Sequence, residues 1–82
     1  MYHTILIYYR CEKTLPLGLR VERSNADPAE CKIWLQAVSL SDANAKSVET
    51  INDIKYHGEA RGLDIEVSAI TYELHQVCME VC

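Results

Sequence analysis

A strand pattern runs without interruption into a helix start near the middle of this 82-residue chain, and this junction most constrains the fold. Polar and apolar residues alternate from about Glu30 to Val38, which is typical of a strand. Ser39-Leu40-Ser41-Asp42-Ala43 follows at once, with hydroxyls that can accept hydrogen bonds from free helix N–H groups and a carboxylate near the positive helix end. A strand that leads directly into a capped helix indicates a small α+β domain.

Length and composition predict a single domain over residues 1–82, with one modest core. Eight basic and 12 acidic residues give a net charge of −4, which opposes nonspecific binding to nucleic acid. No apolar segment approaches the roughly 20 residues that span a bilayer, and the amino-terminal residues lack the features of a secretory signal. We therefore expect a cytoplasmic protein without membrane contact, whose four cysteines are reduced thiols.

The first 38 residues contain the patterns of three strands. Residues 3–12 carry apolar side chains on both faces, which predicts an interior strand. After a loose loop, residues 19–24 alternate as in an edge-like second strand. Ser24-Asn25-Ala26-Asp27-Pro28 is a strong turn signal, because Asn and Asp bond to nearby backbone and Pro fixes its own φ. The third strand is the one that enters the helix.

The helix that begins near Ser39 is expected to be amphipathic. Its predicted apolar stripe consists of Leu40, Ala43, Val48, Ile51 and Ile54, with polar residues on the opposite side. Gly58 is expected to end the helix in a left-handed conformation, and Gly62 to lie in the connection that follows.

The segment from Leu63 to Cys82 fits two patterns. Ile65, Val67 and Ala69 alternate as in a strand, and the phase then shifts at Ile70. Either a second short strand follows around residues 73–76, or the chain becomes a helix; the β-branched and aromatic residues of the first half favour two strands. The predicted fold is therefore α+β: a small antiparallel sheet of four to five strands, in the order β-β-β-α-β-β, with one principal helix packed on one face.

Candidate catalytic and metal-binding residues are sparse. His75, Cys78 and Cys82 have a spacing that would line one helix face, with His57 or Cys31 as a fourth zinc ligand. The chain has no Cys-x-x-Cys pair, however, so buried or terminal thiols are favoured over metal. Cys11 with His3 or His57 likewise has no spacing typical of nucleophilic catalysis. We predict a protein that is not an enzyme and holds no metal or cofactor, with a zinc or thiol domain as an alternative.

A protein-binding surface is the favoured functional interpretation. One helix covers only one side of a sheet, so the other side should be open, with Leu6 among its exposed residues. Aromatic anchors ringed by basic and polar side chains are typical of binding patches. The predicted protein-binding residues are Trp34, Tyr8, Lys32, Gln36, Arg10 and Tyr72.

Other interpretations use the same features. Exposed aromatic rings on a small sheet suit RNA stacking, but the acidic net charge opposes direct nucleic-acid binding. An open sheet also suits self-association, as a homodimer or as a homo-oligomeric accessory subunit. Trp34 would instead be a core residue if it folded over a sheet edge or under the carboxy-terminal segment.

In build, the chain resembles small inhibitor proteins of phages and mobile elements, particularly anti-CRISPR proteins. The resemblance lies in Met1 followed closely by a strand, in Trp34-Leu35-Gln36-Ala37-Val38-Ser39-Leu40-Ser41-Asp42-Ala43 leading into a helix, and in a mildly acidic, short domain. It covers between about a tenth and a quarter of the chain and transfers no functional residue. It implies a non-enzymatic, phage-encoded inhibitor that occupies a surface of a bacterial CRISPR effector complex.

Overall fold

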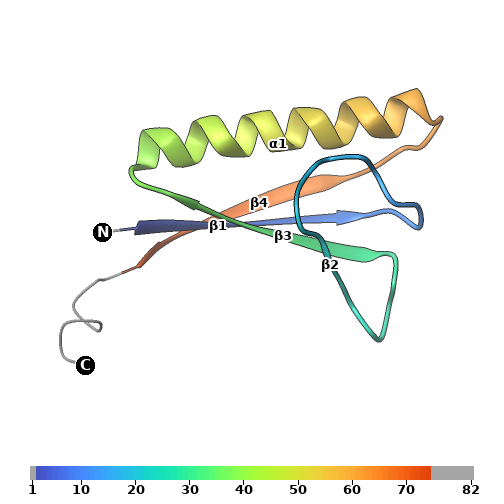
Figure 1. Ribbon diagram of the computed structural model, residues 1–82, viewed down its shortest axis with the longest axis horizontal. Coiled ribbons are helices and arrows are strands. Elements are labelled where there is room, and N and C mark those ends of the chain that lie inside the picture. The colour runs from blue at the N-terminus through green and yellow to red at the C-terminus, as the bar shows by residue number, and fades with distance from the viewer. Residues whose placement is uncertain (1, 75–82) are drawn as a thin grey trace.

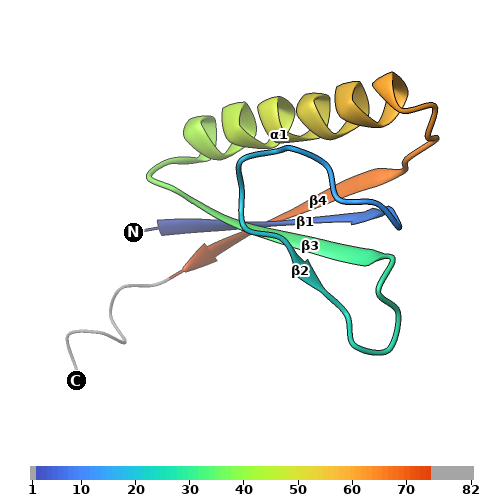
Figure 2. The same ribbon diagram turned by 45° about the vertical axis from the view of Figure 1, so that its right-hand side comes forward.

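One helix lies across one face of a four-stranded antiparallel sheet in the computed structural model, which describes residues 2–74 (Figures 1 and 2). The strands are β1 (Tyr2–Arg10), β2 (Glu22–Arg23), β3 (Glu30–Ala37) and β4 (Val67–Leu74), and the helix α1 (Leu40–Ala60) connects β3 to β4. Their order across the sheet is β2-β3-β1-β4. The α+β prediction is therefore confirmed, with four strands in the described part of the chain.

The position of β1 explains why it is apolar on both faces. It pairs with β3 along one edge and with β4 along the other, so it is an interior strand as predicted. Ile7 lies opposite Ile33 and Ala69, whereas its neighbour Leu6 lies opposite Trp34 and Ile70. Because successive side chains of a strand point to opposite faces, these two rows lie on different sides of the sheet.

The core fills the space between the sheet and α1. Its strand residues include Ile5, Ile7 and Ile33, which are almost completely buried. The helix contributes Ala43, Thr50, Ile54 and Gly58. A Cβ atom added to Gly58 would lie 2.7 Å from the Cδ1 of Ile65, so the missing side chain lets the end of α1 approach the segment that leads into β4.

The predicted apolar stripe of the helix was wrong at two positions. Leu40 and Val48 are 58% and 59% exposed, whereas Thr50 and Gly58 are buried. The stripe was assigned from apolar character, but the helix packs partly through small residues that permit close approach to the sheet. Shape, as well as hydrophobicity, therefore selects the buried side of α1.

The predicted start of the helix is confirmed. The Ser39 hydroxyl accepts a hydrogen bond from the backbone N–H of Asp42 at 3.0 Å, as an N-cap residue does. In return, the Asp42 carboxylate accepts a hydrogen bond from the Val38 N–H at 3.1 Å and pairs with Lys46 at 3.2 Å. The bond from Val38, followed by that from Lys46, lowers the pKa of Asp42 below its usual value.

The helix ends later than predicted. Gly58 lies inside α1, and the left-handed residue is Gly62, with a φ of 70°. The N–H groups of Gly62 and Leu63 donate to the carbonyl oxygens of Glu59 and Gly58, at 3.0 and 2.8 Å. This pair of bonds is the Schellman motif, which satisfies the last free carbonyl groups of a helix.

The second strand is shorter than predicted, because β2 contains only two residues. The segment around it is held instead by the Arg23 guanidinium, which donates to the carbonyl oxygens of Cys11, Lys13 and Pro28 at 2.8, 3.0 and 2.7 Å. The predicted turn after it is confirmed, since the Ser24 hydroxyl accepts a hydrogen bond from the Asp27 N–H at 3.3 Å. Side-chain bonds to backbone thus replace strand pairing here.

The last strand passes through Ile70 without a break. Both expectations for this region were wrong as far as Leu74, because neither a second short strand nor a helix begins there. The phase shift arises because apolar residues change faces: Val67 and Ala69 point toward the α1 side, and Ile70 and Tyr72 to the opposite side. Residues 75–82, on which the rest of these predictions fall, lie outside the described residues. Within residues 2–74, no helix has the length and apolar character needed to cross a membrane.

Candidate functional site

The candidate site is the face of the sheet that points away from α1, which we call the open face. No helix or strand in the described part of the chain covers it (Figures 1 and 2). The strand registers place all six predicted binding residues on this face, together with residues that the prediction left out. Its members are Tyr2, Thr4, Leu6, Tyr8 and Arg10 from β1, Glu22 from β2, Glu30, Lys32, Trp34 and Gln36 from β3, and Ser68, Ile70 and Tyr72 from β4.

An apolar row crosses the middle of the open face. Leu6 lies at its centre, directly between Trp34 and Ile70 on the neighbouring strands. Trp34 is 51% exposed and Ile70 42% exposed, so the prediction that Trp34 lies at the surface is confirmed. The prediction that Leu6 is exposed was wrong, because it is only 4% exposed. Its bulky cross-strand neighbours shield it, as such pairs do in sheets.

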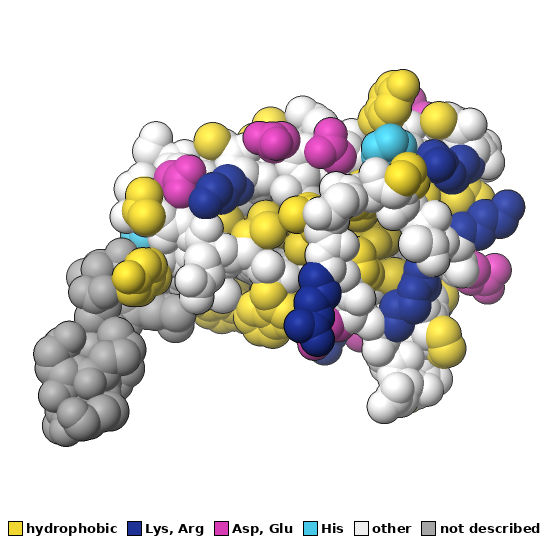
Figure 3. Space-filling view, viewed as in Figure 1, with side chains coloured by type: hydrophobic (Ala, Val, Ile, Leu, Met, Phe, Trp, Pro, Cys, Tyr) yellow, Lys and Arg dark blue, Asp and Glu magenta, His cyan; other side chains and the backbone are white. Residues whose placement is uncertain are grey.

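Tyrosine residues extend this row along β1 and β4. Tyr72 is 44% exposed and Tyr2 is 42% exposed, while Tyr8 is partly buried. The Lys32 ammonium lies 5.8 Å from the centroid of the Tyr8 ring, within the range of a cation–π interaction. Figure 3 shows hydrophobic side chains on the side of the sheet away from α1, with a Lys or Arg side chain beside them. Aromatic and aliphatic groups thus lie next to one another on this face, with charged residues beside them.

The basic side chains of the open face have acidic neighbours. Arg10 donates a hydrogen bond to Asp27 at 2.6 Å, and this contact raises the pKa of Arg10 and lowers that of Asp27. Lys32 lies opposite Glu22 of β2 in the strand register. Both cations therefore have a carboxylate close by, which reduces the positive potential of this face.

A depression of about 290 Å³ lies beside Trp34. It is lined by Lys32 and Trp34 of β3 together with Glu22, Arg23 and Ser24 at the short strand β2. The two-residue length of β2 leaves the outer edge of β3 next to Trp34 unpaired within the described residues. A groove at the margin of an apolar row can receive a side chain of a partner.

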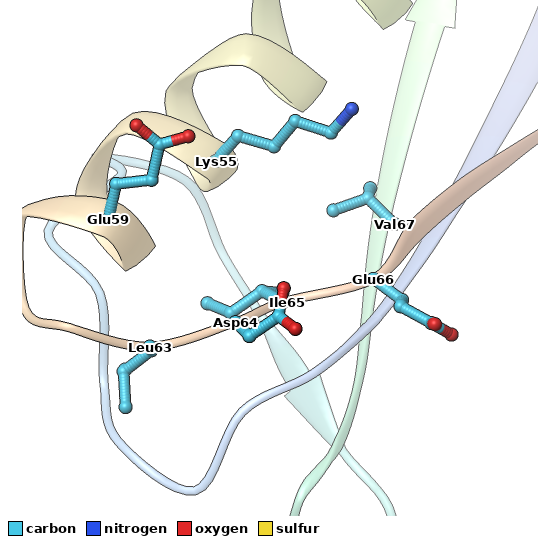
Figure 4. Close-up of a pocket in the computed structure, with 7 residues that line it drawn as sticks. All are labelled: Lys55, Glu59, Leu63, Asp64, Ile65, Glu66 and Val67. Carbon is cyan, nitrogen blue, oxygen red and sulfur yellow. The ribbon is translucent and has the colours of Figure 1, made fainter.

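A larger groove of about 560 Å³ lies elsewhere, between the end of α1 and the segment that leads into β4 (Figure 4). Lys55 and Glu59 of the helix line one side of it, and residues 63–67 the other. Its acidic side chains are Glu59, Asp64 and Glu66, but the part of the chain that the structure describes has no group of three residues placed to hold a metal ion. This groove is separate from the apolar row of the open face.

The cysteines that were considered for chemistry lie in the core. Cys11 and Cys31 are buried free thiols, and the Cys31 thiol donates to the Ala29 carbonyl oxygen at 3.5 Å. The interpretation of Cys11 as a small core residue is therefore confirmed. His75, Cys78 and Cys82, the centre of the zinc alternative, lie outside the described residues.

Sequence analysis missed two members of the apolar surface. Ile70 was noted only as the point where the pattern changes phase, and Tyr2 was considered only as part of a rejected signal peptide. The alternation of side chains along a strand could have identified both residues. Tyr2 is four residues from Leu6 and Ile70 is two residues from Tyr72, so each pair lies on one side of its strand. The strand register was needed to show that these two pairs share one face.

No protein-family model, curated protein or solved structure matches this chain. The functional assignment of the open face therefore depends on its geometry and chemistry.

Proposed function

We propose that this protein is a non-enzymatic binding module that docks a partner protein on its open face. The observation that carries the proposal is Trp34, half-exposed at the end of a row with Leu6 and Ile70. Tryptophan and tyrosine provide much of the binding energy at protein interfaces, because they bury a large area with few rotatable bonds. An exposed row of this composition is uncommon on a surface that meets only water.

The charge distribution favours a protein partner over RNA. Binding to a phosphate backbone needs cations that are free to displace counterions. Arg10 is already paired with Asp27, and Lys32 lies opposite Glu22, on a chain with a net charge of −4. The aromatic rings remain available for apolar contacts, which a protein surface can supply at any charge.

The finer proposal names the partner class. The resemblance to anti-CRISPR proteins implies a CRISPR effector complex as the target and steric occlusion as the mode of inhibition. This part of the proposal depends on the strand-to-helix junction, whereas the binding face depends on Trp34 and its neighbours. We place the interaction in the cytoplasm, where the buried thiols of Cys11 and Cys31 stay reduced.

Capture of CRISPR effectors from bacterial lysates, with the tagged protein as bait, tests both parts. We expect Trp34→Ala to abolish recovery of the partner while the thermal unfolding temperature changes little. Tyr56→Ala is the matched control, because Tyr56 is also an exposed aromatic residue but lies on α1. Capture that survives Trp34→Ala would contradict docking on the open face. Capture of a different protein, lost in the same variant, would retain the binding face and overturn the CRISPR target.

A further inference from the structure

The outer edge of β4 is unpaired in the described part of the chain. β4 pairs with β1 along one side only, and it is the last strand in the sheet order. The residues from Ser68 to Tyr72 are all exposed. An edge of this kind presents a row of backbone N–H and C=O groups that can pair with another strand.

The sequence of this edge does not prevent such pairing. Proteins usually protect edge strands with lysine, proline, bulges or a very short strand. β4 has eight residues, and its exposed stretch Ser68-Ala69-Ile70-Thr71-Tyr72 contains neither proline nor charge. The opposite edge of the sheet is partly occupied, because β2 pairs with β3 at Cys31 and Lys32 and the Lys46 ammonium donates to the Gln36 carbonyl oxygen at 2.8 Å.

The helix flank above this edge carries two apolar residues beside Lys55. Lys55 lines the groove with Val67, and Figure 4 shows its side chain extending over the start of β4, so this flank of α1 faces the β4 side. Val48 and Ile51 lie seven and four residues before Lys55, which places them on the same flank. Val48 is 59% exposed and Ile51 is partly buried. Below them, Ala69 and Thr71 are small exposed residues on the α1 side of β4.

We propose that β4 is a homodimer interface, at which two copies pair their β4 strands antiparallel about a two-fold axis. Charge favours a second copy at this position: each chain carries a net charge of −4, yet residues 68–72 of β4 are exposed and uncharged, so two acidic copies can approach along this stretch without charges facing each other there. The edge is self-complementary, since antiparallel pairing of a strand with itself satisfies both rows of backbone groups.

The area of this edge is sufficient for a specific contact. Eight residues span about 27 Å, and a sheet with one helix layer is about 20 Å thick, so each copy would bury on the order of 500 Å². The total of about 1,000 Å² meets the lower limit of specific interfaces. The dimer would form one continuous sheet with both helices on the same side. Trp34 lies on β3, two strands away from the β4–β4 interface, and stays exposed in the dimer. This inference therefore does not depend on the proposed partner binding.

The test is the mass of the full chain in solution, measured by sedimentation equilibrium from low micromolar to near-millimolar concentration. We expect twice the 9.3 kDa of one chain at the upper concentrations. Ala69→Lys/Thr71→Lys places like charges opposite each other across the joint and should weaken the dimer about 100-fold. Gln36→Lys/Val38→Lys adds the same charge at exposed positions on and after β3 and should leave the dimer unchanged.

A monomer at all concentrations overturns the proposal, as does a dimer that withstands the β4 double variant. If Trp34→Asp abolishes the dimer and the β4 double variant does not, the two copies associate through the open face and not through β4. Amide hydrogen exchange of the unaltered protein provides a second measurement if the lysine variant does not fold. Protection of the β4 amides that increases with protein concentration supports the β4 interface, and protection independent of concentration contradicts it.

Discussion

The two faces of the sheet are made from alternate residues of the same strands, but they exclude water in different ways. Ile7 is fully buried on the α1 side, where a helix covers it. Leu6, the preceding residue, is 4% exposed on the open face, where its shield consists of Trp34 and Ile70. These two side chains cover Leu6 and remain about half-exposed themselves. On the face that no helix covers, the side chains that bury Leu6 are themselves exposed, and they provide an apolar surface that a partner can bind.

The largest expected difference between the two faces is in the effect of removing three side-chain carbon atoms from one residue on each face. Ile7→Ala should lower the free energy of unfolding by about 4 kcal/mol, because the closely packed core under α1 cannot fill the cavity. Leu6→Ala should lower it by only about 2 kcal/mol, since Trp34 and Ile70 can move into the space. Urea denaturation measures both values. Equal losses would indicate that another molecule covers the open face in solution.

Alkaline pH should destabilise the covered face through Tyr9. Burial, and then the neighbouring thiol of Cys31, raises the pKa of Tyr9 to about 12. The folded state therefore keeps its proton where the unfolded state loses it, so stability should fall between about pH 10 and 12 and level off above. Denaturation midpoints measured across this range should show the fall. Tyr9→Phe should remove the part of this loss of stability that Tyr9 causes. If the variant loses stability with pH as the unaltered protein does, Tyr9 is not the group responsible.

The close contact at Gly58 tests how tightly the covered face is packed. Gly58→Ala should destabilise the protein by about 1 to 2 kcal/mol, because the steric cost at Ile65 exceeds the gain in helix propensity. In an Ile65→Val background, which removes the Cδ1 atom, the same change should become neutral or stabilising. Thermal unfolding of the four proteins of this double-mutant cycle measures the coupling. Additive effects would show that Gly58 does not contact Ile65 closely in solution.

The smallest effect on stability is expected at Trp34. Trp34→Ala should reduce the free energy of unfolding by about 1 kcal/mol, because the side chain is half-exposed and its removal also uncovers part of Leu6. Chemical denaturation followed by circular dichroism measures it without the lost fluorophore. A loss of several kcal/mol would mean that Trp34 is a core residue, and the open face would then lose its binding anchor.

Most of the individual elements followed from local pattern. The alternation around Trp34 and the serine at position 39 predicted β3 and the start of α1 correctly. A period of two also placed Trp34, Lys32 and Gln36 on the same side of one strand. The wrong predictions concern features that depend on contacts between segments distant in sequence. The buried side of α1 depends on close approach at Gly58, and the end of α1 depends on a left-handed turn at Gly62.

The candidate site was predicted as a set of residues but not as a surface. Trp34, Tyr8 and Tyr72 come from three strands, and only the registers show that they share a face. The burial of Leu6 and the inclusion of Ile70 depend on the same registers. The function of this face stays a proposal, as does the inhibitor class that the resemblance implies.

The sequence by itself determined the order of elements, the cap at Ser39 and the side of β3 on which Trp34 lies, because each depends on residues close together in the chain. The tertiary structure decided which face α1 covers, how Leu6 is shielded, and that β4 pairs with β1 and lies at the edge of the sheet formed by residues 2–74. These features depend on the register and on the fit between segments that are distant in sequence. Hydrophobic patterning alone does not encode that fit, because many shapes share the same pattern.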